Sequence, residues 1–150
     1  MNYLNKIIAF VIFLFSLIVY IMTMAPTTSF WDCGEFIATS VIMGVPHPPG
    51  TPFYLLLGNL FSQLPTFHDI GARVNLISPI FSAFAVMFLY LIIVQLIEEW
   101  RGESKSFSDF LITYGSAFIG ALTFAFTDSH WFNAVEAEVY SLSTFCTSIV

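Results

Sequence analysis

Four apolar stretches run along this chain, separated by polar segments of unequal length. The first, 7–25, is almost unbroken, and as a helix it would extend about 28 Å, close to the thickness of a hydrocarbon core. Two more cover 74–97 and 110–127, and the last begins at 139 and is still apolar at 150. The pattern predicts four membrane-spanning helices.

A cleaved signal peptide is the alternative for the first stretch, because residues 23–25 offer small side chains at a cleavage-like spacing. The stretch is longer than a typical signal core of about 7–15 residues, and Pro26 would become the new N-terminus, so an uncleaved span is favoured. In the third stretch, Gly115, Gly120 and several alanines are suited to close helix packing.

The basic residues orient the predicted spans. Lys6 precedes the first span, and Arg101 and Lys105 lie between the second and third. Positive residues favour the cytoplasmic side, so we expect the outer loops 26–73 and 128–138 to face the other side together. The result is a multi-pass integral membrane protein, expected in a bacterial inner membrane with these loops facing the periplasm.

Within the first outer loop, residues 51–64 form a shorter apolar segment. As a helix it would reach about 21 Å, which suits an interfacial or re-entrant helix better than a span. Pro52 is well placed in its first turn. The expected fold is therefore all-α, with interfacial helices in the first outer loop.

Composition supports the membrane prediction and excludes one class of partner. The chain is 57% hydrophobic and 9% charged, and a soluble domain of 150 residues could not bury so much apolar surface. Only four residues are Lys or Arg and the net charge is −6, which argues against nucleic-acid binding. The two cysteines, Cys33 and Cys146, form neither a disulfide framework nor a metal-ligand spacing.

The first outer loop carries the leading candidates for chemistry, Asp32 and Glu35, which directly follow Trp31. On a helix, residues three apart share a face, so both carboxylates can aim into one pocket. Carboxylates near a membrane are costly to desolvate and tend to be functional or paired. The simpler interpretation is two solvated acids, with Asp32 capping the helix that follows.

Two further residues of this loop are candidate substrate ligands. His47 lies in a segment rich in proline and glycine, residues 44–54, which predicts a rigid loop. Arg73 stands alone at the outer end of the second span, where its guanidinium suits a phosphate. The alternatives are a tight connector for residues 44–54, and for Arg73 a lipid headgroup contact or an ion pair with Asp32 or Asp69.

The second outer loop adds Glu136, Glu138 and Tyr140 as candidate substrate-binding residues. The two glutamates are two residues apart, so on a helix they point to different faces and only one can share a pocket with Asp32. A polar start to the fourth helix is the alternative. No spacing points to a metal site, so no metal ligand is assigned, although His47, His68 and His130 with the acids are compatible with a divalent cation.

Four motifs in order resemble one known family. They are FWDCGEF at 30–36, HPPGTPFY at 47–54, RVNL at 73–76 and NAVEAEVY at 133–140. They are similar to a membrane family long described as a domain of unknown function, abundant in Bacteroidota and grouped with protein O-mannosyltransferases in the GT-C superfamily. The resemblance covers nearly the whole chain.

This resemblance implies the N-terminal part of a larger GT-C-like enzyme. Such enzymes move a sugar from a polyprenyl-phosphate donor to an acceptor hydroxyl, here of a protein or a glycan, outside the cytoplasm. By position, Asp32 matches the acid of the first outer loop, with Glu35 as its neighbour. In protein O-mannosyltransferases the two acids are adjacent, whereas Cys33 and Gly34 separate them here, so either acid can be the base. A secondary transporter and a non-catalytic assembly subunit are the alternative functions.

Overall fold

The computed structural model describes residues 3–48, 51–102 and 106–150, and each regular element in these ranges is a helix. The helices, in chain order, are α1 (Tyr3–Thr23), α2 (Cys33–Ile42), α3 (Pro52–Ser62), α4 (Ile70–Asn75), α5 (Ile77–Arg101), α6 (Phe107–Phe110), the π-helical turn η1 (Leu111–Gly115), α7 (Ser116–Ala125), α8 (Asp128–Ala134) and α9 (Val139–Ile149). The all-α prediction is confirmed.

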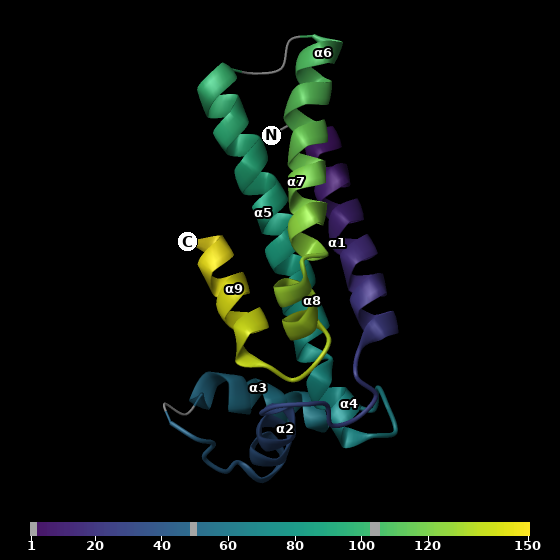
Figure 1. The fold of residues 1–150 in the computed structure, drawn as a ribbon, viewed down its shortest axis with the longest axis vertical. Coiled ribbons are helices and arrows are strands. Elements are labelled where there is room, and N and C mark those ends of the chain that lie inside the picture. Colours follow the sequence, from purple (N-terminus) through teal and green to yellow (C-terminus); the bar gives the residue numbers. More distant parts are fainter. Residues whose placement is uncertain (1–2, 49–50, 103–105) are drawn as a thin grey trace.

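Three helical runs are long and apolar enough to cross a membrane: α1, the run Ile70–Arg101 formed by α4 and α5, and the run Phe107–Ala125 that ends with α7. They lie side by side along the long axis of the molecule (Figure 1). Helix α9 lies against α5 and begins at Val139, where the fourth span was expected. With 11 residues in α9, that fourth crossing stays a prediction.

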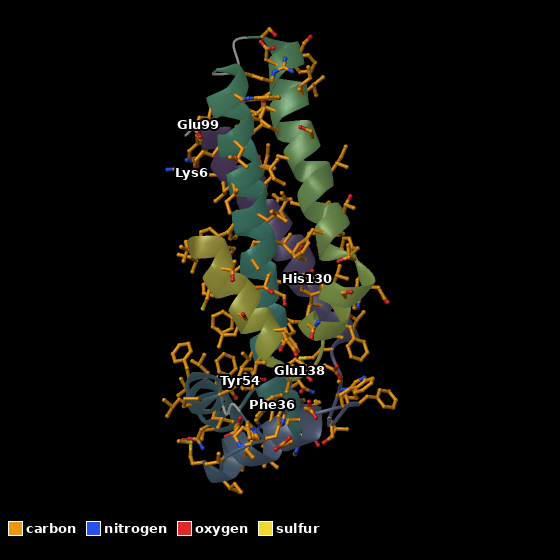
Figure 2. All side chains as sticks on the ribbon, turned by 60° about the vertical axis from the view of Figure 1, so that its left-hand side comes forward. Lys6, Phe36, Tyr54, Glu99, His130 and Glu138 are labelled. Carbon is orange, nitrogen blue, oxygen red and sulfur yellow. The ribbon has the colours of Figure 1, made fainter. Side chains whose placement is uncertain are left out.

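The two ends of this bundle differ in chemistry. The start of α1, the end of α5 and α6 lie at one end, and α2, α3 and α4 lie at the other (Figure 1). Lys6 is at the first end (Figure 2), where Arg101 also pairs with Asp109, at 3.7 Å between Nη2 and Oδ1. Lys105 falls outside the described residues. The described basic residues Lys6 and Arg101 therefore lie toward the end of the bundle opposite α2, α3 and α4, as the orientation expected from the sequence requires.

Alanines on α7 bring the long helices into contact. Ala117, Ala121 and Ala125 are fully buried and recur every four residues, so they line one face against α1 and α5. At the end of this face, the Tyr20 hydroxyl on α1 donates to the carbonyl of Ala125 at 2.8 Å. Small side chains let two helix backbones approach closely.

The packing role expected of Gly115 was wrong. A Cβ atom built at this residue has no heavy atom of the described residues within 4 Å. Gly115 ends the π-helical turn, and it lies about 200° around the helix axis from Ala117, off the buried face. Gly120 does meet α5, because a Cβ there would lie 3.3 Å from Ile93 Cδ1.

Helices α2 and α3 pack against each other across one end of the long helices. Gly58 of α3 meets Ser40 of α2 so closely that an added Cβ would lie 2.6 Å from Ser40 Cβ. Beside them, Asn59 Nδ2 donates to the carbonyls of Ser40 at 3.0 Å and Val41 at 3.3 Å. Pro52 occupies the first turn of α3, as the sequence predicts.

A second apolar core attaches these two short helices to the long ones. Phe36 and Tyr54 pack edge to face at 5.6 Å between ring centroids, and both are buried together with Val74 of α4 and Ile77 at the start of α5. Leu142 of α9 closes the same cluster. Because one core holds α2, α3, α5 and α9, the loops beside these helices have defined positions.

Candidate active site

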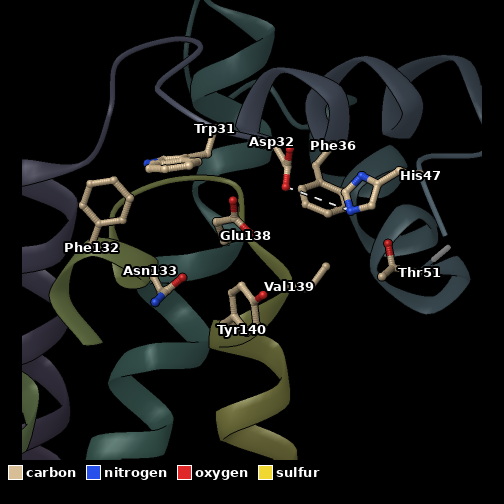
Figure 3. A pocket seen from close by; sticks show the side chains of 10 residues that line it. All are labelled: Trp31, Asp32, Phe36, His47, Thr51, Phe132, Asn133, Glu138, Val139 and Tyr140. Atoms are coloured by element: carbon tan, nitrogen blue, oxygen red, sulfur yellow. Dashed lines mark ion pairs between the residues drawn. The ribbon is translucent and has the colours of Figure 1, made fainter. Parts of the chain in front are cut away.

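A pocket of about 570 Å³ lies between α2, α8 and the start of α9. Its volume is in the range of small-molecule sites. The residues lining it are Trp31, Asp32, Phe36, His47, Thr51, Phe132, Asn133, Glu138, Val139 and Tyr140 (Figure 3). The pocket therefore joins the two outer loops that the sequence singled out, although about 100 residues separate them.

Asp32 is the residue just before α2, and its side chain lines the pocket. Trp31, which precedes it, has a left-handed backbone with φ 56°, a conformation that costs a non-glycine residue about 1–2 kcal/mol. Asp32 occupies the N-cap position of α2, but its carboxylate makes no capping hydrogen bond. The helix-capping interpretation is therefore wrong, and the carboxylate, whose side chain is 57% exposed, is available to the pocket.

Glu35, one turn further along, is bound to His47. Its Oε1 accepts a hydrogen bond from the backbone N–H of His47 at 2.7 Å, and its Oε2 lies 2.7 Å from Nδ1 of the same residue. These two contacts fix the imidazole so that Nε2 lies 4.0 Å from Oδ2 of Asp32 (Figure 3). Both acids thus converge on one histidine, and of the two only Asp32 lines the pocket.

These contacts also set the protonation of the Glu35–His47 pair. The hydrogen bonds from His47 lower the pKa of the Glu35 carboxyl below its ordinary value. The side-chain bond to Glu35 raises the pKa of His47, and the charges of Glu35 and Asp32 act in the same direction. The pair therefore favours a charged carboxylate beside a charged imidazole.

The two glutamates of the second outer loop have different environments, although both lie between α8 and α9 and not on a helix as the spacing argument assumed. Glu138 lines the pocket with 6% of its surface exposed. Glu136 is 1% exposed and does not line the pocket, and neither of its carboxylate oxygens has a hydrogen-bond partner among the described residues. Tyr140 also lines the pocket and is 61% exposed.

Burial and neighbouring charge change the acidity of Glu138. Desolvation, together with the charges of Glu136 and Asp32, raises the pKa of its carboxyl to about 7. In Figure 3 the carboxylates of Asp32 and Glu138 point toward one another across the pocket. The site therefore concentrates negative charge in a small space.

Arg73 does not line the pocket. Its Nε donates to the carbonyl of Phe67 at 2.6 Å, its Nη1 to that of Ser62 at 3.1 Å, and its Nη2 to that of His68 at 3.5 Å. The guanidinium thus holds the turn that connects α3 to α4, at the same end of the molecule as Asp32. Phosphate binding by Arg73 stays a prediction, and none of these contacts involves a pocket residue.

Asn75 is a residue that the sequence reasoning missed. It is fully buried, and its Nδ2 donates to the carbonyls of Ala25 and Thr27, each at 2.8 Å. Its Oδ1 accepts the N–H of Ala137 at 3.0 Å and faces the Cys33 thiol at 3.6 Å. One amide therefore connects three segments: residues 25–27, the start of α2 next to Asp32, and the segment before α9 that carries Glu138. A polar residue at the start of an apolar span was the available signal.

Aromatic side chains of the pocket were missed as well. Phe36 packs at 5.9 Å, between ring centroids, from the His47 ring, and Trp31 and Phe132 line the opposite side. In the sequence they resemble ordinary interfacial aromatics, which no spacing distinguishes from site residues. Flat apolar walls beside acids suit a sugar ring, whose faces are apolar and whose edges carry hydroxyls.

A family model described as "Protein O-mannosyl-transferase TMEM260 N-terminal domain" matches residues 32–150. The chain is 30% identical over 125 residues to "Protein O-mannosyl-transferase TMEM260" of Mus musculus, which covers 83% of this chain and 16% of that protein. It is 27% identical over 135 residues to "Protein O-mannosyl-transferase tmem260" of Dictyostelium discoideum, which covers 88% and 15%. No solved structure matches. The chain thus spans about one sixth of the length of these relatives.

Proposed function

The chain belongs to the protein O-mannosyl-transferase TMEM260 N-terminal domain family, and on this premise we propose that it is part of a membrane glycosyltransferase acting on protein serine or threonine hydroxyls. Its relatives carry the name of such an enzyme, and its long apolar helices suit an integral membrane protein. The observation that carries the proposal is the pocket in which Asp32 and Glu138 face each other beside His47.

The donor is a sugar linked to a polyprenyl phosphate, as in GT-C enzymes. A lipid-borne donor keeps its tail in the bilayer and presents its sugar at the end of the long helices, where the pocket lies. The pocket end is opposite Lys6 and Arg101, so the positive-inside rule gives it a non-cytoplasmic orientation. In the bacterial inner membrane expected from the sequence, that side is the periplasm.

Asp32 is the base of the proposed reaction. A serine or threonine hydroxyl is a weak nucleophile, and a carboxylate within hydrogen-bond reach takes its proton as the oxygen attacks the anomeric carbon. The bond from that carbon to the donor phosphate oxygen breaks, and the lipid phosphate leaves with the electron pair. Glu35 is committed to His47 by two short contacts, which leaves Asp32 as the acid with a free carboxylate.

The proposal is tested in the full-length protein by transfer of labelled mannose from a polyprenyl phosphate to an acceptor protein. Asp32→Asn keeps the shape of the side chain and removes the base, so turnover falls by roughly a hundredfold or more. Asp128→Asn is the matched control, because Asp128 is exposed in the second outer loop and does not line the pocket. Asp32→Asn with full turnover, or no transfer by folded wild-type protein, contradicts the proposal.

A further inference from the structure

The pocket gathers acids without a matching number of cationic side chains among the described residues. Asp32 and Glu138 line it, and Glu35 stands behind His47. Of the described arginines, Arg73 donates to three backbone carbonyls and Arg101 pairs with Asp109 at the far end of the bundle. A phosphate donor entering this space would meet mainly carboxylates, which repel it.

The position of His47 suggests what offsets this charge. Glu35 holds the backbone N–H and Nδ1 of His47 at 2.7 Å each, which leaves Nε2 facing Asp32 Oδ2 at 4.0 Å. That separation is too long for a hydrogen bond. Two ligand atoms that each lie roughly 2.0–2.2 Å from one divalent ion are separated by roughly 3 to 4.4 Å, so the gap has the width of a shared ion.

Glu35 also has the place of a supporting residue in a metal site. Histidines that bind metals usually give their other ring nitrogen to a carboxylate, which fixes the tautomer and the orientation of the ring. Glu35 makes this contact at Nδ1 and a second one to the backbone. The ligand atoms of Asp32, Glu35 and His47 all lie within 4.8 Å of one another.

Glu138 supplies an independent observation on the same space. Its side chain is more than nine-tenths buried, yet its carboxylate points across the pocket toward that of Asp32 (Figure 3). The groups that face it include two more acids, Asp32 and Glu136, besides the N–H of Val139 and the charge of His47. Burying an ionised acid against other acids is costly unless a cation lies between them.

We propose that Nε2 of His47 and Oδ2 of Asp32 bind a divalent cation of the Mn²⁺ or Mg²⁺ class, with Glu35 orienting the histidine and Glu138 facing the ion from the opposite wall. Carboxylate-rich sites suit Mg²⁺ and Mn²⁺, and imidazole adds to the affinity for transition metals. The ion displaces the Nε2 proton that the contact with Glu35 otherwise favours, because only a neutral imidazole binds a metal. One part of this inference rests on the proposed function: the ion also holds the donor phosphate and offsets the charge of the leaving group. Oδ1 of Asp32 remains available to the acceptor hydroxyl.

The test is direct binding of Mn²⁺ to the chelator-treated, full-length protein, measured by electron paramagnetic resonance in the absence of donor. The wild type binds Mn²⁺ and shows coupling to a histidine nitrogen. Asp32→Asn and His47→Gln each lower the affinity by roughly a hundredfold, and Glu35→Gln lowers it by roughly ten- to a hundredfold. Asp128→Asn, the matched control, leaves the affinity unchanged, and melting temperatures show which variants are folded.

The outcomes separate this inference from the proposed function. Absence of Mn²⁺ binding, or binding without histidine coupling in the folded wild type, overturns the metal site, and this result needs no variant. Mannose transfer that persists in excess chelator overturns the metal site and leaves the transferase intact. Mn²⁺ binding that Asp32→Asn and His47→Gln abolish supports the site, even in protein that transfers no mannose.

Discussion

Removal of the Asn75 side chain tests how the two outer loops are held together. In Asn75→Ala, the carbonyls of Ala25 and Thr27 and the N–H of Ala137 all lose their partner. The buried N–H of Ala137 left without a hydrogen bond costs about 1–3 kcal/mol and each part-buried carbonyl about 0.5–1.5 kcal/mol, so the three together lower the local stability by about 3 kcal/mol. The perturbation is large because one amide serves segments distant in sequence.

Cys33 reports this loss directly. Its thiol is fully buried and faces Asn75 Oδ1 at 3.6 Å, so a thiol reagent reaches it only after the loops open. In full-length protein with its other cysteines replaced, about 3 kcal/mol of lost local stability raises the labelling rate of Cys33 roughly a hundredfold. Transfer activity falls as well, because Asp32 and Glu138 lose their common anchor.

The control for this experiment is Asn59→Ala. The Asn59 amide also donates to two backbone carbonyls, those of Ser40 and Val41, but it joins α2 to α3 away from the pocket. It should lower the melting temperature while leaving Cys33 labelling nearly unchanged. Labelling of Asn75→Ala within about twofold of wild type would refute the role of Asn75 as the anchor.

Three further predictions concern packing, pH and Arg73. Gly58→Ala forces a Cβ against Ser40 and should lower stability by about 1–3 kcal/mol, whereas Gly115→Ala, with open space around it, should not destabilise; thermal unfolding in detergent compares the two. Burial lowers the pKa of His130 from 6.5 to about 4, so the stability that the neutral imidazole contributes is complete above about pH 6.5 and is lost as the pH falls toward 4. His130→Phe should flatten that part of the curve of stability against pH. Arg73→Lys cannot reproduce the three carbonyl contacts and should lower the melting temperature, while a raised KM for the donor at unchanged melting temperature would favour phosphate binding instead.

The helical elements were predictable because their signal is local. Apolar runs of sufficient length predict helices in a bilayer wherever they occur, and α1 and the run ending with α7 lie where these runs lie. Pro52 at the start of α3 follows from the same kind of local rule. The helix boundaries differ by a few residues, since helices such as α5 extend through polar residues beyond the apolar window, to Arg101.

The candidate site was predictable in its residue types but not in its contacts. Asp32 and Glu138 were singled out as acids beside spans, yet only the folded chain decides that they face each other. The partner of Glu35 is 12 residues away, across a loop whose path depends on how α2 packs on α3. Arg73 has the same local signal as a phosphate ligand, but its guanidinium reaches carbonyls that the turn before α4 brings near.

By itself the sequence determined that this chain is a set of apolar helices with acids gathered in two loops, because helix formation and transfer to a bilayer depend on neighbouring residues. The tertiary structure alone decided that Asn75 joins these loops and that His47 lies between Glu35 and Asp32. Such contacts are long-range: their directions depend on how several helices pack at once, and no spacing along the chain encodes them.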